Sequence, residues 1–251
     1  MIEVKNLYKS FDGKDVLIDI NATFQDGKTN LIIGQSGSGK TVLMKNLVRL
    51  FVPTSGKILY DGRDFMQMSK QERIAMRREM GMIFQSAALF DSLTVLENVM
   101  FPLDMFSNMT LRERQRRAQE CLDRVNLNDA GAKFPGEISG GMQKRVAIAR
   151  AIALNPKYLF CDEPNSGLDP KTSLVIDELI HNITKEFNTT TIINTHDMNS
   201  VMGIGEHILF IYQGHAAWEG TKDDVMHSDN ELLNNFIFAS DLFRKVKENA
   251  G

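Results

Sequence analysis

One glycine-rich segment of this chain has the composition and spacing needed to hold a phosphate group. It lies between an apolar run and a stretch with helical periodicity, which is the context of a phosphate-binding loop. Glycines let backbone N–H groups turn inward around phosphate oxygens, and the following helix adds the positive end of its dipole. Lys40 is predicted to contact the β- and γ-phosphates, and the Thr41 hydroxyl to ligate Mg²⁺. The predicted loop consists of Gly34, Gln35, Ser36, Gly37, Ser38, Gly39, Lys40 and Thr41.

A second apolar run, YLFC at residues 158–161, ends in two acidic residues. Adjacent acids at the end of a strand most often form a solvated turn or a helix cap, so their meaning depends on the phosphate-binding loop. Beside such a loop, Asp162 is predicted to hold Mg²⁺ and Glu163 to polarise an attacking water. As neighbours on one strand, the two side chains are expected to point in different directions.

The order of the motifs resembles that of the ATP-binding cassette (ABC) ATPases. ISGGMQKR at residues 138–145 comes shortly before YLFCDEP, and the resemblance spans nearly the whole chain through six motifs in the family's order. It implies that ATP and Mg²⁺ are the cofactors and that the working unit is a homodimer. In that dimer, Ser139, Gly140 and Gly141 of one subunit would cover the ATP held by the other. Met142 replaces the family's commonest glutamine, which puts any role of that amide in doubt.

The same resemblance implies roles for four isolated residues. Gln85 follows an apolar run and would contact Mg²⁺ or the attacking water, and His196 would contact the γ-phosphate; with Glu163 they form the predicted catalytic set. Asp169 would lie in a loop that crosses the subunit interface, although its context is also that of a helix N-cap. Phe11 would stack on adenine, with core packing as the alternative.

Apolar periodicity predicts parallel βαβ units with a helical insertion. With the resemblance, this implies an α/β fold: a P-loop NTPase (RecA-like) core with an antiparallel β subdomain and an inserted α-helical subdomain. The predicted ATPase domain spans residues 1–225, with the helical subdomain at about 88–155 and a helical tail at 226–251. Helix starts are indicated by three capping boxes, Ser69 with Glu72, Thr94 with Glu97, and Thr110 with Glu113.

The composition is that of an ordinary soluble globular protein, with 43% hydrophobic and 24% charged residues. A formal net charge of −3 gives no electrostatic case for binding nucleic acid. The two cysteines, Cys121 and Cys161, match no metal-ligand spacing and suit a reducing compartment. No signal-peptide core and no run of about 18 apolar residues occurs, so contact with a membrane is expected through a partner.

Two segments, residues 81–103 and 138–145, most resemble the ATPase of Mla-type systems, which move phospholipids between bacterial membranes with MCE-domain proteins. The resemblance rests on Met142 and on the small-small-Leu-Phe run after Gln85. It implies integral membrane permease subunits and an MCE-domain lipid-binding protein as partners, no nucleic acid, and a peripheral place on the cytoplasmic face of the bacterial inner membrane. The apolar residues after Gln85, which are Ala87, Ala88, Leu89 and Phe90, are predicted to line a groove for a helix of the permease. The alternative is that Leu89 and Phe90, with Val95, Val99 and Phe101, pack the helical subdomain.

Other readings stay open at this point. Transporters of lipoproteins or amino acids, and complexes that control cell division, share the same core motifs. Soluble ABC proteins of DNA repair, chromosome maintenance or translation typically add coiled coils, zinc modules or a second cassette, and none of these is apparent. A non-catalytic binding module would be expected to lack Glu163 or His196. No regulatory domain is expected after the final helix.

Overall fold

The computed structural model describes residues 1–238 and divides the chain into two compact units. The first unit combines Met1–Met68 with the chain from Ile192 onward, and the second covers Ser69–Thr191. No helix of the described residues is long and apolar enough to cross a membrane. Of the predicted helical tail at residues 226–251, residues 239–251 lie outside the described residues.

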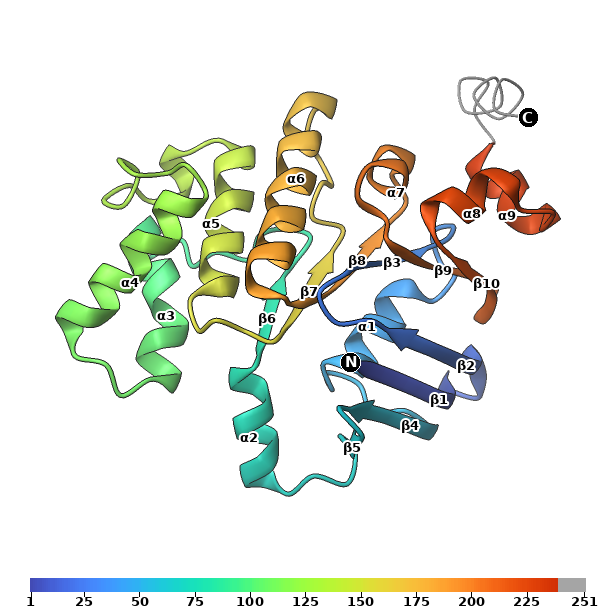
Figure 1. Cartoon of the computed structure of the whole chain (residues 1–251). Helices are drawn as coiled ribbons and strands as arrows, with labels where there is room; N and C mark the ends of the chain where they lie inside the picture. The colour runs from blue at the N-terminus through green and yellow to red at the C-terminus, as the bar shows by residue number, and fades with distance from the viewer. Residues whose placement is uncertain (239–251) are drawn as a thin grey trace. The chain divides into compact units, whose positions relative to one another are not determined.

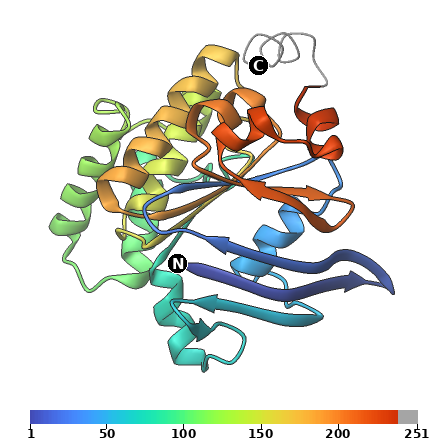
Figure 2. The same ribbon diagram turned by 45° about the vertical axis from the view of Figure 1, so that its right-hand side comes forward.

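An antiparallel sheet in the first unit has the strand order β2-β1-β4-β5 (Figures 1 and 2). Alternating residues of β1, among them Ile2 and Val4, are buried, which follows from the two-residue period of a strand. The hairpin between β1 and β2 turns at Asp12 and Gly13, both with positive φ, as a tight Asp-Gly turn requires. The four strands are β1 (Ile2–Phe11), β2 (Lys14–Phe24), β4 (Ser55–Tyr60) and β5 (Arg63–Asp64).

The rest of the first unit surrounds the fully buried strand β3 (Thr29–Ile33). It pairs in parallel with β9 (His207–Tyr212), which forms an antiparallel hairpin with β10 (His215–Gly220). Because β3 is buried on both faces, its sequence is an apolar run rather than an alternating pattern. The helices of this unit are α1 (Lys40–Leu47), α7 (Met198–Ile204), α8 (Lys222–His227) and α9 (Glu231–Ile237).

Two parallel strands and most of the helices make up the second unit. Strand β6 (Met80–Ile83) pairs with β7 (Tyr158–Asp162), so the residues that follow the two strands come together at one edge. Strand β8 (Thr190–Thr195) crosses the boundary between the units, which lies between Thr191 and Ile192. The helices are α2 (Lys70–Arg78), α3 (Val95–Phe106), α4 (Leu111–Arg124), α5 (Gly140–Ile152), α6 (Pro170–Phe187) and a 3-10 turn, η1 (Pro135–Glu137).

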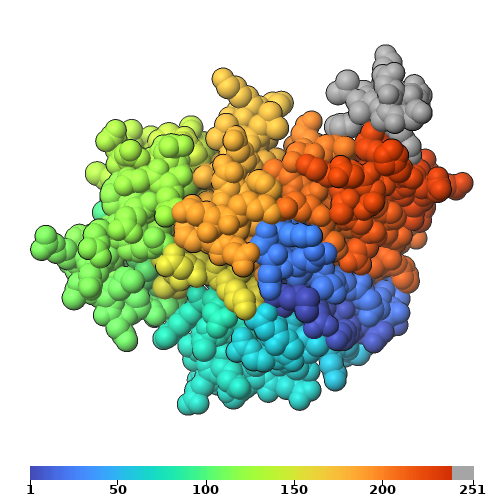
Figure 3. Space-filling model, viewed as in Figure 1, coloured from blue at the N-terminus to red at the C-terminus, as the bar shows by residue number. Residues whose placement is uncertain are grey.

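Helices α3, α4 and α5 pack together in the range predicted for the helical subdomain, and in Figure 3 residues of this range form one continuous surface region, coloured green. All three predicted capping boxes are confirmed, at the N-termini of α2, α3 and α4. In each box the hydroxyl accepts from the third backbone N–H of the helix while the Glu carboxylate accepts from the cap N–H. Helix α1 ends at Leu47, and Arg49, two residues further on, takes a left-handed conformation that stops the helix.

Candidate functional site

The predicted phosphate-binding loop joins β3 to α1 in the first unit. Gly39 is the N-cap of α1, and no side chain caps this helix end. An uncapped N-terminus presents backbone N–H groups together with the positive end of the helix dipole, which is the arrangement that binds a phosphate. Lys40, almost fully buried, donates hydrogen bonds to the carbonyls of Gly34 at 2.8 Å and Gln35 at 3.0 Å.

Two further observations fit this loop to a phosphate group. The Ser38 hydroxyl is buried and has no hydrogen-bond partner among the described residues, and a phosphate oxygen would supply one. Gly34 has φ +149°, and a Cβ atom there would lie 2.3 Å from the carbonyl oxygen of Ile211. A side chain at this position would therefore push β9 away and deform the loop.

Phe11 and His196 also belong to the first unit. Phe11, at the end of β1, is 38% exposed, so part of its aromatic surface is available to a base. It contacts Phe51 edge-on, with ring centroids 5.2 Å apart, and the Lys9 ammonium lies 4.7 Å from the centre of its ring. The alternative of a buried core residue does not fit this exposure. His196 follows β8 and is exposed, so its ring is accessible to a ligand.

In the second unit the structure brings Gln85 and Glu163 together. Gln85 follows β6, and its side-chain nitrogen lies 3.1 Å from the Ser166 hydroxyl and 3.4 Å from a carboxylate oxygen of Glu163. Asp162 is the last residue of β7, and both acids are half-buried. Glu163 has φ +46°, a left-handed conformation that costs a non-glycine residue about 1–2 kcal/mol. Such a conformation directs the Glu163 side chain away from the path that the strand would give it.

Ser139, Gly140 and Gly141, here called the signature residues, line one cavity of about 720 Å³ together with Asp169. Ser139 is the N-cap of α5 and accepts a hydrogen bond from Met142 N, which leaves its hydroxyl hydrogen able to donate. Asp169 is the N-cap of α6, and the hydrogen bonds from the Thr172 hydroxyl and backbone N–H lower the pKa of its carboxyl group. The N-cap role of Asp169 is confirmed. Its role at a subunit interface stays a prediction.

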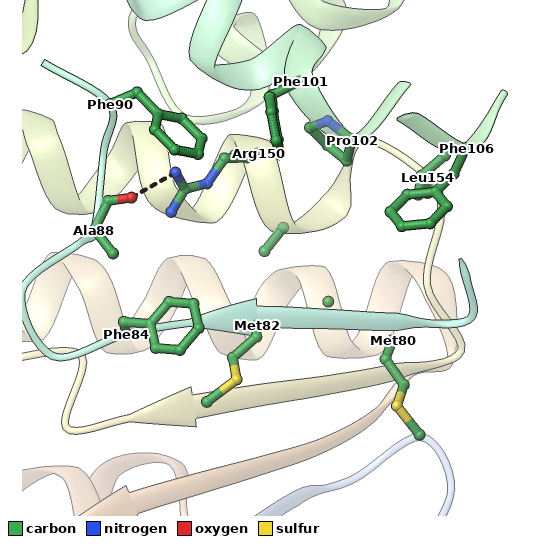
Figure 4. Close-up of a pocket in the computed structure, with 12 residues that line it drawn as sticks. Met80, Met82, Phe84, Ala88, Phe90, Phe101, Pro102, Phe106, Arg150 and Leu154 are labelled. Carbon is green, nitrogen blue, oxygen red and sulfur yellow. Dashed lines mark hydrogen bonds between the residues drawn. The ribbon is translucent and has the colours of Figure 1, made fainter. Parts of the chain in front are cut away.

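A groove of about 500 Å³, here called the apolar groove, opens beside β6, α3 and α5 (Figure 4). The rings of Phe90 and Phe101 pack with centroids 4.7 Å apart, and each is about 40% exposed. Of the four apolar residues predicted to line the groove, Ala88 and Phe90 do so. The prediction was wrong for Ala87, which is buried, and for Leu89, which is half-buried outside the groove lining. The groove is lined by Met80, Gly81, Met82, Phe84, Ala88, Phe90, Phe101, Pro102, Phe106, Arg150, Ala151 and Leu154.

Sequence reasoning missed two cations of α5, Lys144 and Arg150. Lys144 is buried and donates a hydrogen bond to the Gln85 carbonyl. Burial lowers the pKa of Lys144, an effect that the Glu163 carboxylate opposes, and burial also lowers the pKa of Arg150. Arg150 lies in an apolar stretch of the sequence, where a charged residue needs a partner, but Lys144 lies between two polar residues and gave no such signal.

Comparison with known proteins identifies the family that this geometry belongs to. Residues 17–166 match the family described as ABC transporter. The chain belongs to this family. A solved dimer, the post-hydrolysis state of the ATP-binding cassette MJ0796 bound to ADP and Pi, superposes with a TM-score of 0.81 at 33% identity, covering 88% of this chain and 99% of that one. The predicted fold class, a P-loop NTPase with mixed α/β sheets, is thereby confirmed.

Three curated relatives align with 94% of this ABC chain. The probable ribonucleotide transport ATP-binding protein mkl of Mycobacterium leprae is 36% identical, and the alignment covers 68% of its length. The methionine import ATP-binding protein MetN of Photobacterium profundum is 40% identical, with 70% of its length covered. The intermembrane phospholipid transport system ATP-binding protein MlaF of Haemophilus influenzae is 35% identical, with 90% of its length covered. The chain is therefore the ATPase subunit of a transport system. The names of these relatives span several substrates, so identity alone does not select one.

Proposed function

We propose that this chain is a Mg²⁺-dependent ATPase that works as a head-to-tail homodimer and drives a permease for phospholipids between bacterial membranes. The loop at residues 34–41 binds the triphosphate through its amides and Lys40, and Phe11 stacks on the adenine. Thr41, Gln85 and Asp162 would hold Mg²⁺, which would neutralise charge on the phosphate oxygens. These roles follow the family resemblance and the residue chemistry described above.

Within this proposal Glu163 is the base for the attacking water. Its carboxylate accepts a proton as the water attacks, and the side-chain nitrogen of Gln85 lies 3.4 Å from that carboxylate. His196 donates to the γ-phosphate and so stabilises the charge that develops there.

The dimer follows from the cavity that contains Ser139, Gly141 and Asp169. Ser139 and Gly141 can donate into this cavity, which Asp169 also lines. Two-fold symmetry would bring each such cavity over the ATP of the other subunit. The solved dimer of the related cassette bound to ADP and Pi supports this arrangement.

The apolar groove is the observation that carries the transport proposal. Phe84 and Ala88, on either side of Gln85, line it, and Phe90 extends it. An amphipathic helix of a membrane permease fits such a groove with its apolar face, so movement of the Gln85 segment would move the permease. We therefore propose a peripheral place at the cytoplasmic face of the inner membrane, with permease subunits and no nucleic acid as partners.

The phospholipid substrate rests on the resemblance of residues 81–103 and 138–145 to Mla-type ATPases, and the MlaF relative supports it. An MCE-domain lipid-binding protein would then be a further partner. Amino-acid import is the second candidate, because the MetN relative is the more identical one. Substrate contacts lie in the permease, so a test on the cell is needed to separate the two.

Deletion of the gene in its own organism separates the two candidates. If phospholipid is the substrate, the deletion disturbs the lipid asymmetry of the outer membrane and raises detergent sensitivity, and a plasmid with the wild-type gene restores both. A plasmid encoding Glu163→Gln does not restore them. Unchanged lipids together with lost methionine uptake would contradict the lipid proposal and support amino-acid import.

A further inference from the structure

Two cations of α5 donate to the backbone of one short loop, residues 84–88, here called the Gln85 loop. Lys144 donates to the Gln85 carbonyl, and Arg150 donates through its two terminal nitrogens to the carbonyls of Ala87 and Ala88, both at 2.7 Å. The bond from Arg150 to Ala88 is drawn in Figure 4. Neither cation forms an ion pair among the described residues, and the hydrogen bonds of both go to neutral carbonyl groups, although the Glu163 carboxylate is near enough to favour the charged form of Lys144.

The Gln85 loop has a backbone that alanine disfavours. Ala87 has φ +62° and Ala88 has φ +49°, two successive left-handed residues without a glycine. The turn is closed by a hydrogen bond from Ala87 N to the Phe84 carbonyl at 2.9 Å. Such a conformation persists only where surrounding groups hold it. The planar guanidinium of Arg150 does so, because its two parallel N–H groups reach two neighbouring carbonyls at once.

The Gln85 loop connects the predicted base to the apolar groove. On one side the Gln85 side chain contacts Ser166 and Glu163, and on the other Phe84, Ala88 and Arg150 line the groove. The helix that holds the loop also begins at the signature residue Ser139. A displacement of the loop at the groove therefore changes the surroundings of Glu163 unless α5 resists it.

We propose that Lys144 and Arg150 are positioning residues that hold the Gln85 loop in its left-handed form, and so set the position of Gln85 against Glu163. The expected effect of these residues on kcat rests on the proposed ATPase function. Their hydrogen bonds to the Gln85 loop do not depend on that function. The left-handed pair at Ala87 and Ala88 is maintained by Arg150 and lost without its two-pronged hydrogen bond.

The first test measures hydrogen exchange of the backbone amides in residues 84–88 of the full chain. Arg150→Lys keeps the positive charge but cannot donate to both carbonyls in the same geometry, and we expect exchange in this segment to become at least fivefold faster. The matched control is Arg117→Lys, since Arg117 of α4 donates to the carbonyls of Ala153 and Ile152 at the far end of α5. Unchanged exchange in Arg150→Lys, or equal acceleration in the control, would overturn the inference.

The second test measures ATP hydrolysis and asks for rescue. Arg150→Lys should lower kcat about tenfold with KM for ATP within twofold, because the phosphate contacts are untouched. Adding Ala87→Gly and Ala88→Gly should restore at least half of kcat, since glycine adopts the left-handed conformation without cost. If Arg150 serves only to pack α5, the two glycine substitutions will not restore kcat, and that result would overturn the inference. If the wild-type protein does not hydrolyse ATP, that result contradicts the proposed function. The hydrogen-exchange test then still decides the inference about the Gln85 loop.

Discussion

The side-chain nitrogen of Gln85 lies 3.4 Å from a carboxylate oxygen of Glu163, although the two residues are 78 positions apart. They meet because Gln85 follows β6, Glu163 follows β7, and the two strands are parallel neighbours. At 3.4 Å the contact is long for a hydrogen bond, and the 3.1 Å contact of Gln85 with the Ser166 hydroxyl is better formed. A small shift of Gln85 therefore changes its relation to Glu163.

Phe90→Asp in the apolar groove is expected to uncouple ATP hydrolysis from transport in the purified complex. A carboxylate in the groove is costly to bury against an apolar helix, so the permease docks poorly. ATP affinity of the isolated protein should stay within twofold. The measurement is transport per ATP hydrolysed in proteoliposomes. The control is Met105→Asp, on the same helix as Phe101 but outside the groove and 60% exposed; an equal loss in the control would contradict the prediction.

A mixed dimer of Lys40→Ala and Ser139→Ala chains tests the shared sites. If each site combines the phosphate loop of one chain with the signature of the other, both defects fall in one site and the second site is intact. Hydrolysis should then reach up to about half of the wild-type rate, clearly above either mutant homodimer. Mixed dimers no more active than the homodimers would speak against shared sites, unless the two sites are strictly coupled.

Removal of the Phe11 ring should weaken ATP binding about tenfold, a loss within the range of base stacking on an aromatic side chain. Phe11→Ala is compared with Phe11→Tyr, which keeps the ring and should bind within twofold of wild type. Calorimetric titration with ATP gives both affinities. If Phe11→Ala binds ATP as tightly as the wild type, Phe11 does not stack on adenine and its role is the contact with Phe51.

The N-cap of α4 gives a prediction on stability. Thr110→Ala removes the hydroxyl that caps this helix and should lower the free energy of unfolding by about 1 kcal/mol, measured by urea denaturation near pH 7. Hydrogen bonds from Thr110 lower the pKa of Glu113 in the folded protein. The stabilisation by these bonds is therefore present above the ordinary carboxyl pKa and is lost as the pH falls through the lowered pKa of Glu113. The difference between wild type and variant should shrink in acid; a constant difference would contradict this.

Local features of this chain could be predicted from its sequence. The phosphate loop and the capping boxes depend on residues within a few positions of one another, and the structure has them where the spacing placed them. The lining of the apolar groove was harder, because Ala87 and Ala88 are neighbours of one type, yet one is buried and the other faces the groove. Lys144 and Arg150 were missed because their partners are main-chain carbonyls of a distant segment, which leave no mark in the sequence.

The rate of ATP hydrolysis by the Glu163→Gln variant tests most directly the central claim that Glu163 is the base for the attacking water. The amide cannot accept a proton from the attacking water, while the phosphate contacts of the loop at residues 34–41 remain. ATP should bind within about twofold of wild-type affinity, and kcat in the presence of Mg²⁺ should fall at least about 100-fold. Near-normal kcat of this variant would contradict the assignment of Glu163 as the base and, with it, the account of the site.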